Sequence, residues 1–155
     1  MSTDQAPSGW KSGRGLMIFA AVTYGVLPTI IDIFDPHHMG NPDWPPHAKL
    51  HLLWLIGMGL SLCLYSISLF WRATIERPQG IYTGAAIGAC QVGAFYAAGL
   101  LSSVFGAAFD ADGRLLLGFL PPALLHFLIS GSLLAAGFVL ATQALKKAKP
   151  STASD

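Results

Sequence analysis

Four long apolar stretches constrain the fold of this chain more than any other feature of its sequence. A helix that crosses a bilayer needs about 20 mostly apolar residues. We expect spans from about Gly15 to Phe34, Trp44 to Trp71, Gly80 to Phe109, and Leu115 or, preferably, Pro121 to Leu145. The sequence therefore predicts an all-α fold, a four-transmembrane-helix bundle in one domain at residues 15–145, between disordered cytoplasmic tails at 1–14 and 146–155.

The composition agrees with a protein that the bilayer surrounds. Only 11% of the residues are charged and 53% are apolar, whereas a soluble domain has about 25% charged residues. The net charge of +1 and the lack of a basic stripe exclude a nucleic-acid-binding surface. The expected surroundings are those of a multi-pass protein of the cell (plasma) membrane.

The basic residues predict the orientation. With four spans, seven of the nine lysines and arginines fall on the side of the two termini, and only Lys49 and Arg114 fall on the other. Because basic residues are enriched on the cytoplasmic side, we expect an N-in/C-in topology. The loop after the first helix and the aspartates Asp110 and Asp112 then face outward.

The segment from Asp32 to Trp54 concentrates the polar chemistry of the chain. It holds four of the five histidines, three of the eight acidic residues and four of the ten prolines. Before it, Pro28 should disrupt the first helix and free a carbonyl near Tyr24, which a neighbouring group must satisfy. Within it, Asp43 is the expected N-cap of the second helix.

The second helix carries one polar and aromatic stripe. At alternating spacings of four and three residues it presents His47, His51, Trp54, Met58, Ser61 and Tyr65. Residues at these spacings share one helix face. The opposite face holds leucines and Ile56, which lipid accommodates. We therefore expect the stripe to point into the bundle and to line an apolar pocket.

The third helix has small residues at intervals of four. Gly80, Gly84 and Gly88 form one series, and a second series contains Ala85, Ala89 and Gly93. Such spacing favours close helix packing over room for a ligand. Gln91 is expected to make a hydrogen bond between helices.

Asp32, His51 and His126 should lie at similar depths on three different helices, with His47 above them. Because ionisable groups within a membrane are functional by default, we expect these four residues to be catalytic. The leading hypothesis is acid–base chemistry on a small apolar or lipid-like molecule. Its binding residues would be Trp54, Met58, Tyr65, Gln91 and Tyr96, and no cofactor is required.

Three alternatives stay open. A metal ion could be held by His47, His51, His126 and Asp32. A haem could be held between His51 and His126. The protein could also be a non-catalytic accessory subunit, with a partner membrane subunit or a second copy of itself as its partner.

The segment from Asn41 to His51 reads N-P-x-W-P-P-H-A-K-x-H. It resembles a signature of small four-helix integral membrane proteins that have no agreed activity, so the resemblance implies the fold and the importance of His47 and His51. The chain is also faintly similar to membrane sterol-isomerase-like proteins, which use histidine and glutamate within a helical bundle. It departs from them because Glu76 lies on the expected cytoplasmic side and no glutamate stands near the histidines.

Overall fold

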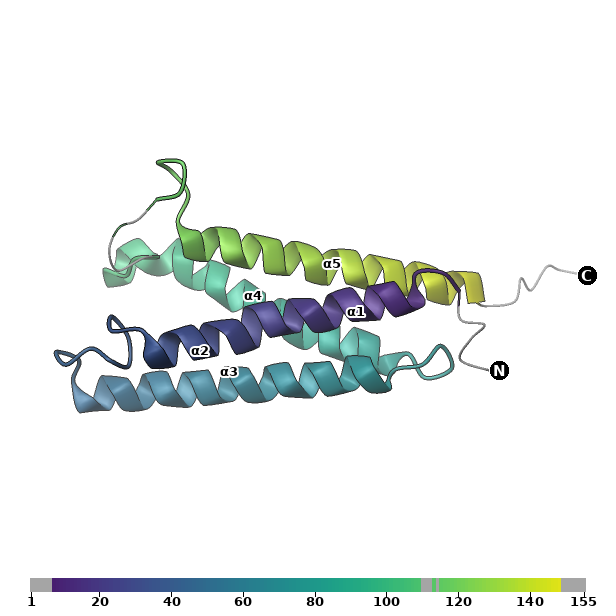
Figure 1. Ribbon diagram of the computed structural model, residues 1–155, viewed down its shortest axis with the longest axis horizontal. Helices are drawn as coiled ribbons and strands as arrows, with labels where there is room; N and C mark the ends of the chain where they lie inside the picture. The colour runs from purple at the N-terminus through teal and green to yellow at the C-terminus, as the bar shows by residue number, and fades with distance from the viewer. Residues whose placement is uncertain (1–6, 110–112, 114, 149–155) are drawn as a thin grey trace, which may run out of the picture.

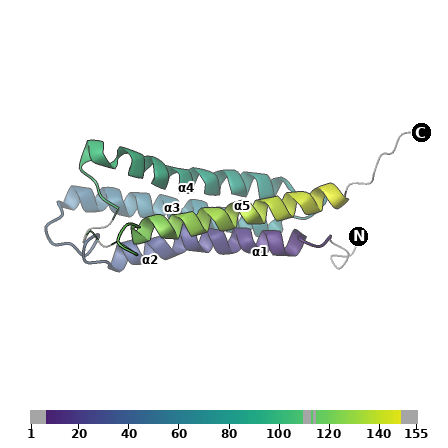
Figure 2. The same cartoon turned by 90° about the horizontal axis from the view of Figure 1, so that it is seen from above.

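The chain forms a single bundle of long helices in the computed structural model, which describes residues 7–109, 113 and 115–148 (Figures 1 and 2). The described elements are α1 (Trp10–Ala21), the π-helical turn η2 (Val22–Val26), α2 (Leu27–Phe34), α3 (Pro46–Arg72), α4 (Gln79–Phe105) and α5 (Pro122–Ala148). Since α1, η2 and α2 are continuous, they make one rod, and each of the four rods is long and apolar enough to cross a membrane. The predicted all-α, four-helix transmembrane fold is confirmed, and the protein is a multi-pass integral membrane protein.

The first helix begins earlier than predicted. Trp10, expected in a tail that ends at residue 14, is buried with 3% of its surface exposed. The guanidinium of Arg14 donates hydrogen bonds to the carbonyls of Trp71 (3.0 Å) and Ala73 (3.1 Å) at the end of α3. The predicted tail boundary is therefore wrong, because these contacts fix the first helical turns. The predicted C-terminal tail at 146–155 likewise begins too early, because α5 continues to Ala148. The rest of the predicted disorder, at residues 1–6 and 149–155, falls outside the described residues.

The helices are arranged so that α1 lies between α5 and α3, while α4 packs on both from the other side (Figures 1 and 2). Helices α3 and α5 therefore lie diagonally across the bundle. The contact of α1 with α5 is backbone to backbone: a Cβ added to Gly13 would lie 2.7 Å from the carbonyl oxygen of Gly137. Two glycines thus bring these helices together at the closest approach that two backbones allow.

Pro28 disrupts the first rod as predicted. In the π-helical turn the N–H of Leu27 donates to the carbonyl of Val22, five residues back. The next bond in that register would run from residue 28 to Thr23, but proline has no N–H. The carbonyl of Thr23, one residue from the predicted position, is left for another donor.

The loops correct one prediction and confirm another. Helix α3 begins at Pro46 and has no side-chain cap, so the prediction of Asp43 as N-cap is wrong. The N–H of Asp43 instead donates to the side-chain oxygen of Asn41 (2.9 Å). This hydrogen bond closes a turn over residues 41–43, before the helix begins. Helix α5 begins at Pro122, close to the preferred start, and the residues before it form a separate turn closed by Leu116 and Leu120.

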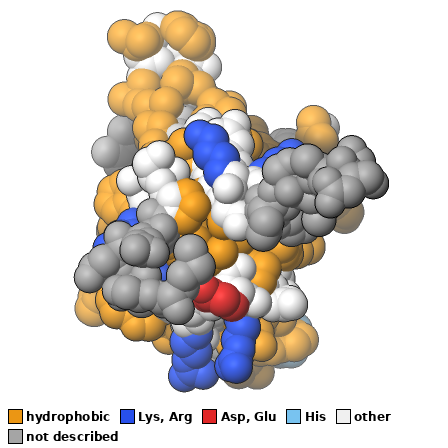
Figure 3. All heavy atoms as spheres, turned by 90° about the vertical axis from the view of Figure 1, so that its right-hand side faces the viewer, with side chains coloured by type: hydrophobic (Ala, Val, Ile, Leu, Met, Phe, Trp, Pro, Cys, Tyr) orange, Lys and Arg blue, Asp and Glu red, His pale blue; other side chains and the backbone are white. Residues whose placement is uncertain are grey.

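Charge is distributed unequally between the two ends of the bundle. The end with both termini and the α3–α4 connection (the terminal end) shows gathered lysine and arginine side chains (Figure 3). The opposite end (the loop end) carries the loop between α2 and α3, with Asp35, Asp43 and the start of α5. Which end faces the cytoplasm stays a prediction.

Candidate functional site

The side chain of His126 contacts the disrupted turn, η2, of the first rod. Its Nε2 lies 2.8 Å from the carbonyl oxygen of Thr23. Because a carbonyl only accepts hydrogen bonds, this nitrogen carries the proton and donates it. The ring of His126 therefore satisfies the carbonyl of Thr23, which Pro28 leaves without an N–H donor. This hydrogen bond joins α5 to the first rod, so it contributes to helix packing.

Asp32 pairs with the following loop. Its carboxylate lies 3.6 Å from Nδ1 of His38, which is also 3.8 Å from the carboxylate of Asp35. The ring of His38 stands edge-on to Trp44, with 6.4 Å between centroids. At these separations the charges attract when His38 is protonated, but no hydrogen bond forms. Sequence reasoning missed His38, although its position just past the end of the helix that carries Asp32 could have indicated the pair.

The stripe on α3 points away from the bundle. The exposed fractions are 63% for Trp54, 47% for Met58 and 55% for Tyr65. The buried side of α3 instead carries Ile56, Cys63, Ser66 and Phe70. The prediction that the stripe lines an internal pocket is wrong, because aromatic side chains are also stable at the lipid boundary.

His47 and His51 form a pair on this outer face. Their Nε2 atoms are 3.0 Å apart, and the two rings meet edge to face with 4.5 Å between centroids. The ring of His51 also lies 6.1 Å from that of Trp54. Both histidines are exposed, so the pair is open to the surroundings at the start of α3.

The predicted three-helix site is therefore not assembled. Asp32 has His38 as its partner, His51 has His47, and His126 has Thr23. Over residues 7–109, 113 and 115–148, no group of three or more His, Cys, Asp or Glu side chains could hold a metal ion. The predicted four-ligand metal set is wrong for this reason. The structure does not show the arrangement that the haem alternative needs, with His51 and His126 facing each other. The two residues stand on diagonal helices, where His51 is exposed and contacts His47 and His126 contacts Thr23.

Gln91 behaves as the sequence predicts. Its side-chain nitrogen donates to the carbonyl of Gly59 on α3 at 2.8 Å. The hydrogen bond joins α4 to α3 in the apolar part of the bundle. The prediction of an interhelical hydrogen bond is confirmed, and its contact directs the side chain towards α3.

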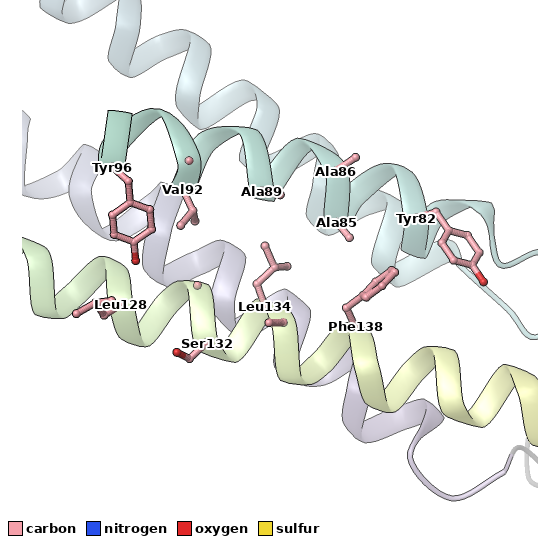
Figure 4. Close-up of a pocket in the computed structure, with 13 residues that line it drawn as sticks. Tyr82, Ala85, Ala86, Ala89, Val92, Tyr96, Leu128, Ser132, Leu134 and Phe138 are labelled. Atoms are coloured by element: carbon pink, nitrogen blue, oxygen red, sulfur yellow. The ribbon is translucent and has the colours of Figure 1, made fainter. Parts of the chain in front are cut away.

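The described part of the structure contains a large groove between α4 and α5 (Figure 4). Its volume is about 720 Å³, and its walls are almost wholly apolar. The lining residues are Tyr82, Ala85, Ala86, Ala89, Val92, Gly93, Tyr96, Leu128, Gly131, Ser132, Leu134, Ala135 and Phe138. Buried Val92 and Leu134 form the floor, and exposed alanines and glycine stand at the mouth.

Aromatic contacts near its two ends explain why the groove is open. Near the loop end the rings of Phe95 and Phe127 stack with 3.8 Å between centroids. Near the terminal end Tyr82 and Phe138 meet edge to face at 5.9 Å. The residues between these contacts are mostly alanine, glycine and serine. Because the rings hold the two helices apart there, these small side chains leave the space above Val92 and Leu134 unfilled.

Only Tyr96 among the predicted binding residues lines this groove. The other lining residues were missed, although the series Ala85, Ala89 and Gly93 was the signal. The spacing predicts a packing seam, whereas in the structure these residues form one wall of the groove.

No known protein family, curated protein or solved structure matches this chain. A functional proposal therefore rests on the groove and the side chains around it.

Proposed function

We propose that the protein binds a lipid-like molecule by holding one long apolar chain in the groove between α4 and α5. The observation that carries the proposal is the groove itself, which is apolar, about 720 Å³ in volume and bounded by aromatic contacts. Sites for small molecules are mostly apolar and have volumes of about 300–1,000 Å³. A groove on the side of a membrane bundle receives its ligand directly from the bilayer.

The groove is long enough for an extended hydrocarbon chain. From Tyr82 to Tyr96 the wall of α4 extends for about 21 Å, at 1.5 Å per residue. Because the walls along this length are almost wholly apolar, the groove accommodates a hydrocarbon chain along its length.

Hydroxyl groups add a limited polar contribution. The hydroxyl of Tyr96 lies 3.8 Å from the position of a Cβ added to Gly131, and Ser132 is the next residue on the same wall. Tyr82 stands towards the other end. A ligand with a single hydroxyl, carbonyl or ester group can hydrogen-bond one of these hydroxyls while its chain occupies the apolar floor.

Binding is the function that the groove supports. The acid–base transformation predicted from the sequence stays a prediction, because the described residues that line the groove include no histidine or carboxylate. The haem alternative and the faint similarity to sterol-isomerase-like proteins receive no support from the groove either. An accessory subunit that carries a bound lipid is compatible with the same geometry.

The test compares two glycines that have open space around them. Among the described residues, no neighbouring side chain or other helix lies within 4 Å of a Cβ added to Gly93, in the groove, or to Gly57, on α3. The change Gly93→Leu therefore places a large side chain in the groove, and Gly57→Leu adds the same side chain outside it. The protein would be purified into lipid nanodiscs and labelled with a photoreactive long-chain alcohol, and the labelled peptides would be identified by mass spectrometry.

We expect labelling of α4 and α5 peptides in the natural protein and in Gly57→Leu, and loss of most of it in Gly93→Leu. An excess of unlabelled long-chain alcohol should compete. Equal labelling of the two variants, or labelling spread evenly over all four rods, would overturn the proposal.

A further inference from the structure

The histidine pair on the outer face of α3 has the geometry of a metal chelate. Its two Nε2 atoms are 3.0 Å apart, and both rings are exposed at the start of the helix. In the metal-free protein one Nε2 donates its proton to the other, since two acceptors would repel at this distance. The two rings therefore already stand side by side on one helical turn, and rotation of these exposed side chains can bring both nitrogens onto one ion.

The ligand type favours particular metals. Neutral imidazole nitrogens suit zinc, copper and nickel, and the affinity of a nitrogen site for divalent ions is highest for Cu²⁺, above both Ni²⁺ and Zn²⁺. Two imidazoles within one helical turn can occupy adjacent positions in the square-planar or tetragonal geometry that Cu²⁺ prefers.

From these observations we infer that His47 and His51 form a two-histidine clamp for Cu²⁺. Each Nε2 donates a lone pair to the ion. The histidine that carries its proton on Nε2 changes to the tautomer with the proton on Nδ1, so the pair releases no net proton. Water or a ligand from outside completes the coordination. The clamp is a site separate from the groove, because neither histidine lines the groove.

One feature near the clamp disfavours a cation, because the N-terminal end of α3 carries partial positive charge. It acts against every cation, so the metal with the strongest imidazole bonds is the one that binds. The same argument selects Cu²⁺ over Ni²⁺ and Zn²⁺.

The experiment titrates Cu²⁺ into untagged, metal-free protein in detergent, followed by electron paramagnetic resonance. We expect one ion per chain, with hyperfine coupling to two imidazole nitrogens. Because the second ligand acts within the same molecule, His47→Asn and His51→Asn should each weaken binding by roughly a hundredfold. Both residues are exposed, so the fold should survive either change.

A matched control keeps the number of histidines and changes only their spacing. The double variant His47→Asn with Leu50→His places two histidines next to each other in sequence, about 100° apart around the helix, and Leu50 is exposed. It should bind Cu²⁺ as weakly as His47→Asn alone, and His37→Asn should bind it as the natural protein does. Full binding by the double variant, or by His51→Asn, would overturn the inference.

Discussion

Helix α4 has two faces built from small residues at the same spacing, and the structure uses them in opposite ways. Gly84 faces the buried ring of Phe70, and Gly88 faces Tyr24 and Leu134 so closely that an added Cβ would lie 2.6 Å from the tyrosine oxygen. On the other face, Gly93 has nothing within 4 Å, and Ala85 and Ala89 line the groove. The spacing is therefore not what decides between packing and binding. A large side chain on the neighbouring helix enters one face, and small residues oppose the other.

The packed face should show the largest effect of substitution. A leucine in place of Gly84 would collide with the ring of Phe70, which is fully buried. Overpacking a core usually costs about 1–3 kcal/mol and sometimes more. We expect Gly84→Leu to abolish folding or nearly so, measured as monodisperse yield and thermal midpoint in detergent. A midpoint equal to that of the natural protein would show that this face is not packed.

His126 gives a second, smaller effect on the packed side. Replacing it by leucine removes the donor to Thr23 and leaves a carbonyl unsatisfied within the bundle. An unsatisfied buried acceptor costs about 1–3 kcal/mol, but hydrogen bonds in membrane bundles average about 0.6 kcal/mol. We expect His126→Leu to lower the free energy of unfolding by about 1 kcal/mol.

The cause of this loss can be isolated with Pro28. In Pro28→Ala the helix regains a backbone N–H at residue 28, which can donate to a carbonyl of the same helix. The hydrogen bond from His126 to the carbonyl of Thr23 is then no longer needed to satisfy that acceptor. His126→Leu should then cost less in the Pro28→Ala background, with a coupling of about 0.5–1 kcal/mol. Purely additive effects of the two changes would mean that His126 does not act through the disrupted turn.

The sequence predicted the four spans and the disruption at Pro28 because length, hydropathy and proline act locally. It also predicted the hydrogen bond of Gln91, because an amide in an apolar helix must find a partner. It failed on the direction of the α3 stripe. In water, an apolar face must be buried, but in a membrane both the core and the lipid are apolar. Hydrophobicity therefore left undecided whether Trp54 or Ile56 faces inward.

The groove could not be predicted for a related reason. Whether Gly93 packs or stays open depends on which residue of α5 lies opposite, and this depends on the register set by Phe95 with Phe127 and by Tyr82 with Phe138. These contacts join residues far apart in the chain. No pattern along a single helix contains that information.

The smallest effect is the most direct test of the comparison. The change in the free energy of unfolding caused by replacing glycine with alanine should have opposite signs on the two faces of α4. Replacing glycine by alanine within a helix gains up to about 1 kcal/mol of intrinsic stability. Gly93 and Gly57 have room for the added methyl group, so Gly93→Ala and Gly57→Ala should both raise the free energy of unfolding by a few tenths to about 1 kcal/mol. Gly84→Ala should lower it, because its methyl meets Phe70.

The stabilities of the Gly93→Ala and Gly57→Ala variants should differ when a ligand is present. A bound chain stabilises the folded protein in proportion to its occupancy, and a methyl group on residue 93 takes up space in the groove whereas one on residue 57 does not. In delipidated detergent the two alanine variants should have equal stability. In nanodiscs that contain the lipid carried through purification, Gly93→Ala should be the less stable of the two. Equal stability in both media would show that nothing occupies the groove, and the small residues of that wall would then need another explanation.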